Sequence, residues 1–176
     1  GVLSSSLAID KELSKKIFIK HNILTPKYLK FSFRNNLNKS KLIINLQKKI
    51  GFPLVVKPLN EGSSVNVFIC NKHNILKTLI KLNENGEVLL EKYIPGREIQ
   101  VAILENKVLG AIELRPTREF YDYQAKYNPK ARTEHIIPVE ISKNKYQELT
   151  KIALKAHKIL NCRGVTRSDF RYYKNS

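Results

Sequence analysis

One short stretch, residues 52–67, limits what this chain can fold into more than any other part of it. The stretch reads FPLVVKPLNEGSSVNV, so that Lys57 and a Gly-Ser-Ser turn lie between two β-branched runs. Residues 54–56 have the composition of a buried strand, and the proline after Lys57 keeps this lysine extended and ends the strand. Gly62 permits a tight backbone path, and the serines after it add hydroxyl and N–H groups that bind anions. The stretch is typical of a hairpin that holds phosphate, but an ordinary hairpin with a solvated lysine would have the same composition.

The chain has 176 residues and a formal net charge of +17. That length suits one domain or two small lobes. So large a positive charge implies an anionic partner, which could be nucleotide phosphates, nucleic acid or a membrane surface. The lysines are scattered along the chain rather than gathered in one block, so we interpret much of the excess as solvated surface. Charge alone leaves the choice among these partners open.

The two cysteines, Cys70 and Cys162, lie far apart, each beside an apolar run. We predict two buried free thiols in a reducing cytoplasm rather than a disulfide. The cysteines and the dispersed histidines provide no zinc-ligand spacing. The sequence shows no bilayer-spanning apolar run and no secretory signal, so we expect a soluble cytoplasmic protein with no membrane partner. The chain starts at Gly1 and contains no methionine, which indicates a piece of a longer protein.

Periodicity along the chain predicts an α+β fold. Asp10 is expected to cap a helix, and residues 116–134 are expected to form a long functional loop whose aromatic residues argue against disorder. The final strand is expected to carry Thr166 and Ser168 on its polar face. The other predicted helices cover residues 37–50, the segment after Asn71 and residues 146–160, and the predicted strands cover residues 28–33, 54–56, 87–93, 99–104, 108–114 and 165–172.

The common phosphate and nucleophile motifs are absent from the sequence. No Walker lysine follows Gly62 at the required spacing, no G-x-G-x-x-G opens a helix, and no Ser/His/Asp order with nucleophile-elbow glycines occurs. A nucleoside triphosphate needs cations along its phosphates, an acceptor for the ribose hydroxyls, a backbone strip for adenine and carboxylates for magnesium. A dispersed set of charged residues provides most of those groups: Lys57, Glu91, Lys92, Glu98, Arg167 and Asp169.

Five motifs occur in order along the whole chain: Gly1-Val2-Leu3 with Asp10-Lys11, Val56-Lys57-Pro58 with Glu61-Gly62-Ser63-Ser64-Val65, Glu91-Lys92 with Gly96 and Glu98, Phe120-Tyr121-Asp122-Tyr123 with Ala125-Lys126-Tyr127, and Arg167 with Asp169. On these motifs the chain resembles the D-alanine:D-alanine ligases, which are ATP-grasp enzymes. The Phe-Tyr-Asp-Tyr motif separates these ligases from other ATP-grasp enzymes. The resemblance implies a partial ATP-grasp fold of the α+β class, with two α/β lobes and the nucleotide between them.

The resemblance also implies how the chain is divided and what it does. Residues 1–25 would contain a helix that leads into the ATP-grasp domain, residues 26–94 would form its small central lobe, and residues 95–176 would begin its large C-terminal lobe, with the loop 116–134 as a lid. The implied reaction joins two D-alanines for peptidoglycan precursors. ATP phosphorylates one carboxylate, and the amine of the second D-alanine attacks the acylphosphate and expels phosphate. The full-length protein is expected to be a homodimer.

Residue roles follow from the same resemblance. The ATP-binding residues would be Lys11, Lys57 and Lys126 at the phosphates, Glu91 and the backbone of Lys92, Tyr93 and Ile94 at adenine, Glu98 at the ribose, and Phe120 in the lid. The catalytic residues would be Ser63 and Tyr127, hydrogen-bonded to one another as the lid shuts, and Arg167, whose guanidinium suits the transferring phosphoryl group. Asp169 would hold Mg²⁺ or Mn²⁺. The side chains of Lys57, Lys92 and Arg167 are expected to surround one triphosphate, with Asp169 facing the same cleft.

The chain also departs from the family pattern. The family's Rossmann-like N-terminal domain and its last two magnesium ligands, a Glu and an Asn, are absent, and Asn66 stands where a glycine is usual. We therefore expect these residues alone to bind ATP weakly and not to complete the reaction. Two alternatives remain. One is another ATP-grasp carboxylate–amine ligase, for D-lactate or a different amino acid, and the other is a basic nucleic-acid-binding module, whose affinity would fall steeply with salt. Our preferred reading has a small-molecule substrate and no nucleic acid.

Overall fold

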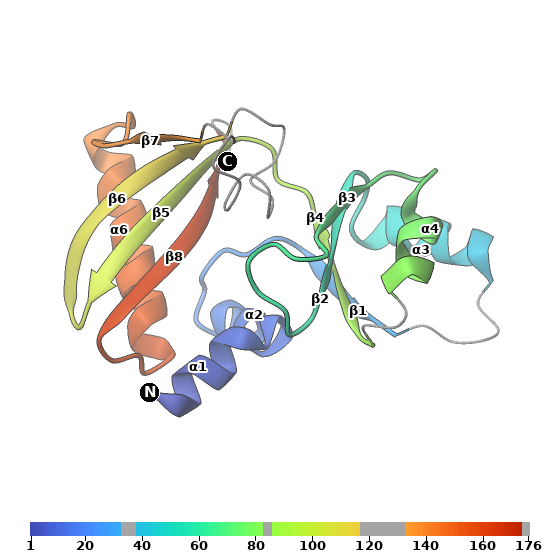
Figure 1. The fold of residues 1–176 in the computed structure, drawn as a ribbon, viewed down its shortest axis with the longest axis horizontal. Helices are drawn as coiled ribbons and strands as arrows, with labels where there is room; N and C mark the ends of the chain where they lie inside the picture. The colour runs from blue at the N-terminus through green and yellow to red at the C-terminus, as the bar shows by residue number, and fades with distance from the viewer. Residues whose placement is uncertain (33–37, 83–85, 117–132, 174–176) are drawn as a thin grey trace.

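The computed structural model describes residues 1–32, 38–82, 86–116 and 133–173. Its strands form two antiparallel four-stranded sheets in separate lobes, joined by residues 93–96 (Figure 1). The first sheet has the order β1-β4-β2-β3 and the second the order β7-β6-β5-β8. The predicted α+β class is confirmed. The strands are β1 (Tyr28–Phe31), β2 (Leu54–Pro58), β3 (Phe68–Cys70), β4 (Val88–Lys92), β5 (Arg97–Leu104), β6 (Lys107–Arg115), β7 (Glu134–Ile136) and β8 (Val165–Tyr172).

The first lobe buries one face of its sheet against two helices, α3 (Lys39–Lys49) and α4 (Ile75–Leu82). Alternation along β2 decides which side chains take part. Leu54 and Val56 are fully buried in this core, whereas Lys57 points to the opposite face of the sheet. The face of the first sheet opposite α3 and α4 therefore carries the lysine that the sequence singled out.

The second lobe packs α6 (Lys143–Ile159) on one face of its sheet (Figure 1). The prediction for the polar face of β8 is wrong. Thr166 lies on the α6 side, where its hydroxyl is 2.7 Å from Nδ1 of the buried His157. Arg167 and Asp169 lie on the opposite, exposed face, together with Val165 at the start of the strand. Thr166 can face inward because the buried histidine offers its hydroxyl a hydrogen-bond partner inside the lobe.

The N-terminal helices contact both lobes. Asp10 caps α2 (Lys11–Lys20) by accepting a 2.9 Å hydrogen bond from the Leu13 N–H, as predicted. A separate helix before this cap, α1 (Val2–Ile9), was not predicted. Ser4 on α1 donates to the Asn161 carbonyl of the second lobe at 2.7 Å, and the Lys11 N–H reaches the Leu59 carbonyl of the first lobe at 3.4 Å.

The predicted hairpin exists, but its return strand comes later in the chain. Val56 pairs with Phe68, so β3 is the strand that pairs with β2, and residues 59–67 form the loop between them. The left-handed backbone in this loop does not fall on Gly62. Ser63 (φ 52°), Ser64 (φ 59°) and Asn66 (φ 55°) adopt it instead.

Two further expectations concern the thiols and the membrane. Cys70 and Cys162 are both free, as predicted, but only Cys70 is buried. Among the described residues, no helix has the length and apolar character that crossing a membrane requires.

Candidate functional site

Three lysines gather around one buried carboxylate on the face of the first sheet that α3 and α4 leave uncovered. Glu91 on β4 is only 7% exposed and lies opposite Val55 of β2 in the sheet register. Lys57, two residues along β2 on the same face, forms an ion pair with Glu91 Oε2. Lys15 of α2 approaches from the other side, with its Nζ 2.6 Å from Glu91 Oε1. We call Lys11, Lys15, Lys57 and Glu91 the lysine cluster.

Lys11 completes the lysine cluster from the first turn of α2. A lysine there opposes the helix dipole, so helix stability gives no reason for it. Its ammonium instead donates to the carbonyls of Leu59, at 3.0 Å, and Glu61, in the loop after β2. Burial lowers the pKa of Lys11, and repulsion from the charge of Lys57 lowers it further. The two ammonium groups are therefore close enough to repel one another, which favours an anion beside them.

Glu91 keeps its charge in spite of its burial. Burial alone raises its pKa, but attraction to Lys57 and Lys15, with hydrogen bonds from both, outweighs that effect and holds the pKa below the ordinary value. A negative carboxylate thus separates two of the ammonium groups. The lysine cluster carries three positive charges against one negative charge.

A second polar surface lies on the face of the second sheet away from α6. The register of β5 with β8 sets Glu98 opposite Arg171 and Gln100 opposite Asp169. Arg167 and Asp169 form a bidentate pair, with Nε–Oδ1 at 2.7 Å and Nη2–Oδ2 at 3.0 Å. Cationic and carboxylate groups therefore share this surface.

The linker between the lobes is held by Arg171. Its Nε donates to the Ile94 carbonyl at 3.3 Å, its Nη2 donates to the Gly96 carbonyl at 2.7 Å, and its Nη1 lies 3.6 Å from Glu98 Oε2. Gly96 has a φ of 109°, and a Cβ there would lie 2.2 Å from the Tyr172 carbonyl oxygen, so no other residue fits. Linker backbone and the carboxylate of Glu98 are thus fixed by one side chain.

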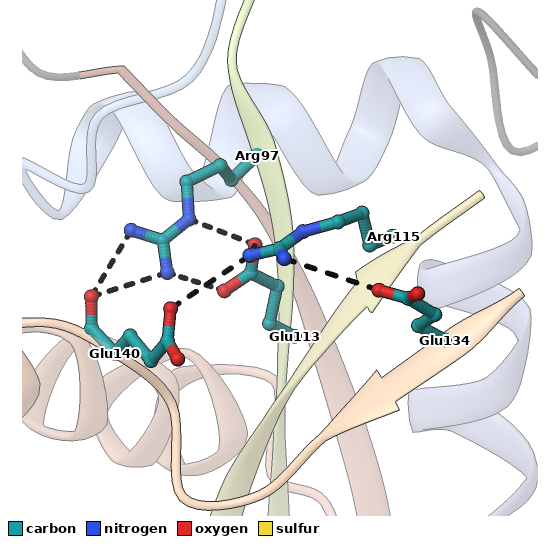
Figure 2. A network of polar contacts seen from close by, with 5 residues as sticks. All are labelled: Arg97, Glu113, Arg115, Glu134 and Glu140. Carbon is teal, nitrogen blue, oxygen red and sulfur yellow. Dashed lines mark hydrogen bonds and ion pairs between the residues drawn. The ribbon is translucent and has the colours of Figure 1, made fainter. Parts of the chain in front are cut away.

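A separate ion network joins β5, β6 and β7 of the second sheet (Figure 2). Glu113 on β6 is 1% exposed and accepts a bidentate pair of hydrogen bonds from Arg97. Arg97 also donates to the Glu140 carbonyl at 3.1 and 3.2 Å. Arg115 Nη2 lies 3.2 Å from Glu113 Oε1, and Arg115 Nη1 lies 3.9 Å from Glu134 Oε2 on β7. Sequence reasoning gave no role to these residues, because their pairing depends on strand register.

The structure brings some of the predicted site residues together and separates others. Lys11, Lys57 and Glu91 share the lysine cluster, and Glu98, Arg167 and Asp169 share one face of the second sheet. The expectation that the Lys92 side chain joins the other cations is wrong. Alternation along β4 turns it to the helix side, where a Cβ on Gly51 would lie 3.4 Å from its Nζ.

Backbone groups near adenine's expected position are partly engaged. The Lys92 N–H donates to the Lys27 carbonyl at 2.8 Å, and the Tyr93 N–H to the Pro53 carbonyl at 3.4 Å. Three predicted residues, Phe120, Lys126 and Tyr127, lie outside the described residues. Within the described ranges, no group of three or more His, Cys, Asp or Glu residues is placed to hold a metal. The role of Asp169 as a metal ligand therefore rests on the sequence resemblance alone.

Two residues of these surfaces were missed by sequence reasoning, Lys15 and Arg171. Lys15 lies four residues after Lys11, so both occupy one side of α2, and this spacing was the available signal. Arg171 lies two residues after Asp169 on β8, where alternation puts both on one face. Neither pattern reveals the partners, which come from distant parts of the chain.

The chain is similar in sequence to D-alanine–D-alanine ligases. A family model described as "D-ala D-ala ligase C-terminus" matches residues 17–176. A D-alanine–D-alanine ligase of Pelagibacter ubique is 62% identical over 174 residues, which cover 98% of this chain and 56% of that protein. The chain spans about half the length of the curated relatives it matches.

Solved structures agree with the sequence relatives. A D-alanine–D-alanine ligase from Bacillus anthracis matches with 37% identity and a TM-score of 0.80, over 98% of this chain and 55% of that chain. Another structure of a D-alanine–D-alanine ligase from Bacillus anthracis, complexed with ATP, matches with 31% identity and a TM-score of 0.77, over 98% of this chain and 53% of that chain. The VanG D-Ala:D-Ser ligase from Enterococcus faecalis matches with 26% identity and a TM-score of 0.80, over 98% and 50%.

Proposed function

The chain belongs to the D-ala D-ala ligase C-terminus family, and on that premise we propose that it forms the nucleotide-binding part of a ligase that joins two D-alanines at the expense of ATP. Its fold is the α+β ATP-grasp fold of the ligase structures it matches. The observation that carries the proposal is the lysine cluster, because an anion-binding group of this kind lies on the lobe surface where the family motif predicted phosphate. A relative 62% identical to the chain bears the ligase name.

The reaction we propose has two steps. The γ-phosphoryl group of ATP passes to the carboxylate of the first D-alanine, which gives an acylphosphate and ADP. The amine of the second D-alanine then attacks the acyl carbon, and phosphate leaves from the tetrahedral intermediate. Both steps move negative charge, so fixed cations and exclusion of water are the protein's main contributions.

The lysine cluster would hold the phosphates in this scheme. Lys11 and Lys57 would neutralise phosphate oxygens, and their mutual repulsion would be relieved when an anion lies between them. Support comes from the lowered pKa of Lys11, whose causes are burial and the charge of Lys57. Glu91 and the backbone of residues 92–94 would contact adenine.

The second sheet would complete the site. Glu98 would accept from the ribose hydroxyls, and Arg167 would stabilise charge on the transferring phosphoryl group. Asp169 would supply a carboxylate oxygen to Mg²⁺ or Mn²⁺, whose preferred ligands are oxygen atoms, and the metal would neutralise phosphate charge. The ion pair between Arg167 and Asp169 is exposed, which fits this assignment. Each side chain can give up this pairing and bind a ligand or a metal ion instead.

The remaining roles taken from the resemblance stay predictions. Ser63 would help order the amino-acid site, and Phe120, Lys126 and Tyr127 concern residues outside the described parts of the chain. We also propose that the whole protein is a homodimer and lies in the cytoplasm. Its partners would be the small-molecule substrates D-alanine and ATP.

The test of the function is ADP release by the full-length protein. We expect release that requires D-alanine and Mg²⁺ together, and a D-alanyl-D-alanine product found by mass spectrometry. ADP release indifferent to D-alanine, together with RNA binding that weakens steeply with salt, would instead favour the nucleic-acid-binding module.

The second candidate is a ligase with a different second substrate. The structural match to VanG D-Ala:D-Ser ligase favours testing it, because its TM-score equals that of the Bacillus anthracis D-alanine–D-alanine ligase. Competition among D-alanine, D-serine and D-lactate as second substrate separates the candidates. We expect the D-alanine product to dominate.

A further inference from the structure

Lys15 is a buried lysine for which the proposed reaction has no use. It is 5% exposed on α2. Its ammonium lies 2.6 Å from Glu91 Oε1, donates to the Pro26 carbonyl at 3.0 Å and donates to the hydroxyl of Thr25. An ammonium has three N–H donors, and three acceptors surround this one. Lys15 is therefore saturated by the protein and buried away from any ligand.

Packing alone does not account for an ammonium at this position. Burial lowers the pKa of Lys15, and only the charge and hydrogen bond of Glu91 oppose that effect strongly. The Tyr28 ring, with its centre 5.1 Å from the Nζ, adds a weaker attraction. An apolar side chain of similar length would fill the space with no desolvation penalty. The charge therefore needs another explanation.

The explanation lies in how Glu91 is shared. One carboxylate oxygen faces Lys15 and the other faces Lys57, whose side chain is 23% exposed and is the only one of the pair that solvent reaches appreciably. With Lys15 present, the negative charge is divided between two ammonium groups. Without it, Glu91 would neutralise Lys57 alone and hold its ammonium against the sheet.

We propose that Lys15 is a positioning residue for nucleotide phosphate: it balances the charge of Glu91, and so leaves Lys57 positively charged toward the ligand side of the lysine cluster. The inference rests on the proposed function, because it assumes that phosphate binds at Lys11 and Lys57. It adds a residue that acts through Glu91 and never touches the nucleotide.

The experiment compares Lys15→Met with Lys16→Met in the full-length protein. Lys16 is the next residue on α2, but its side chain is 58% exposed and its ion pair is with Glu12. Calorimetric titration with ATP and with adenosine gives the readout. For Lys15→Met we expect ATP affinity to fall about tenfold and adenosine affinity to change much less, since the lost charge acts on phosphate. Lys16→Met should match the wild type with both ligands.

A double-mutant cycle separates charge balance from packing. In a Glu91→Gln background the carboxylate charge is gone, so adding Lys15→Met should change ATP affinity little. An equal loss in both backgrounds would overturn the inference, because it would mean that Lys15 only packs. The double variant leaves no uncompensated buried carboxylate, so it should fold even if Lys15→Met alone does not. In that case ATP affinity is compared between Glu91→Gln and the double variant, where we expect no difference and where a tenfold loss would overturn the inference.

The outcomes also separate this inference from the function on which it rests. If the wild-type protein binds ATP and Lys15→Met binds it equally well, the role given to Lys15 is wrong and the ligase proposal stands. If the wild-type protein binds neither ATP nor adenosine, the nucleotide site itself is wrong.

Discussion

Lys57 is the residue on which nucleotide affinity should depend most. Replacing it by alanine removes a cation from the phosphate position, and we expect ATP affinity to fall by about 100-fold. The fold should survive, because Lys15 still compensates the buried charge of Glu91. ATP titration with thermal unfolding measures both quantities.

Lys77→Ala is the matched control for this change. Lys77 is exposed on α4, which covers the opposite face of the first sheet. It should leave ATP affinity unchanged. A Lys57→Ala protein that folds and binds ATP as tightly as the wild type would contradict the role given to Lys57.

Lys11 should make ATP binding depend on pH in the alkaline range. Burial and the charge of Lys57 lower its pKa from the ordinary 10.5. Because the charged form attracts phosphate, affinity should be full below the lowered pKa and should decline as pH rises through it, before pH 10.5 is reached. Fluorescence titrations with an ATP analogue across this range measure the decline.

Arginine keeps its charge throughout that range, so Lys11→Arg provides the control. The early part of the decline should disappear in this variant. An identical pH profile in both proteins would assign the titration to another group.

At the scale of elements, the Arg97–Glu113–Arg115 network ties β5, β6 and β7 together. Hydrogen bonds from Arg97 are the main cause that holds the pKa of Glu113 below its ordinary 4.5, against an opposing effect of burial. Glu113→Gln should lower the free energy of unfolding by about 2 kcal/mol at neutral pH, since charged hydrogen bonds are lost. Chemical denaturation at several pH values measures this difference.

The sign of the pH effect follows from the lowered pKa of Glu113. The carboxylate stabilises the fold above pH 4.5, and this contribution is lost as pH falls through the folded-state pKa below that value. The gap between wild type and Glu113→Gln should therefore close in acid. Glu105→Gln, at the exposed turn between β5 and β6, should show no gap at any pH.

Elements with a strong local signal were predictable from the sequence. The cap of α2 and the direction of Lys57 follow from a helix-start residue and from strand alternation. α1 was missed because its serines have a weak helix preference, and Ser4 finds its partner in Asn161, far along the chain. β7 is too short for any period to appear.

The candidate site was predictable only as far as motifs reach. The family motifs named Lys11, Lys57 and Glu91, which the structure brings together. The burial of Lys15 could not be predicted, since its acceptors come from β4 and the chain before β1. The direction of Lys92 was predictable from alternation, because Leu90 on the same strand faces the core.

At the scale of the whole molecule, Arg171 connects the linker to the second lobe. Arg171→Ala frees the carbonyls of Ile94 and Gly96, so both ATP and adenosine should bind about tenfold more weakly, from the loss of charged hydrogen bonds near the base and ribose. Lys57→Ala should instead weaken ATP alone. The ratio of the two affinities, measured by calorimetry, distinguishes them.

Arg163→Ala serves as the control, since Arg163 is exposed in the turn before β8. It should leave both affinities at the wild-type level. A loss confined to ATP in Arg171→Ala would place Arg171 at the phosphates and not at the linker.

The first twenty residues contact both lobes: Ser4 bonds to Asn161 in the second lobe, and Lys11 and Lys15 bond to Leu59 and Glu91 in the first. Figure 1 shows α1 and α2 beside both lobes. If the lobes rotated about the linker at residues 93–96, α1 and α2 would have to move with one lobe. Their hydrogen bonds to the other lobe, at Asn161 or at Leu59, would then be stretched. The amino-terminal helix pair therefore limits how far the two lobes can rotate apart, in addition to any limit that the linker imposes.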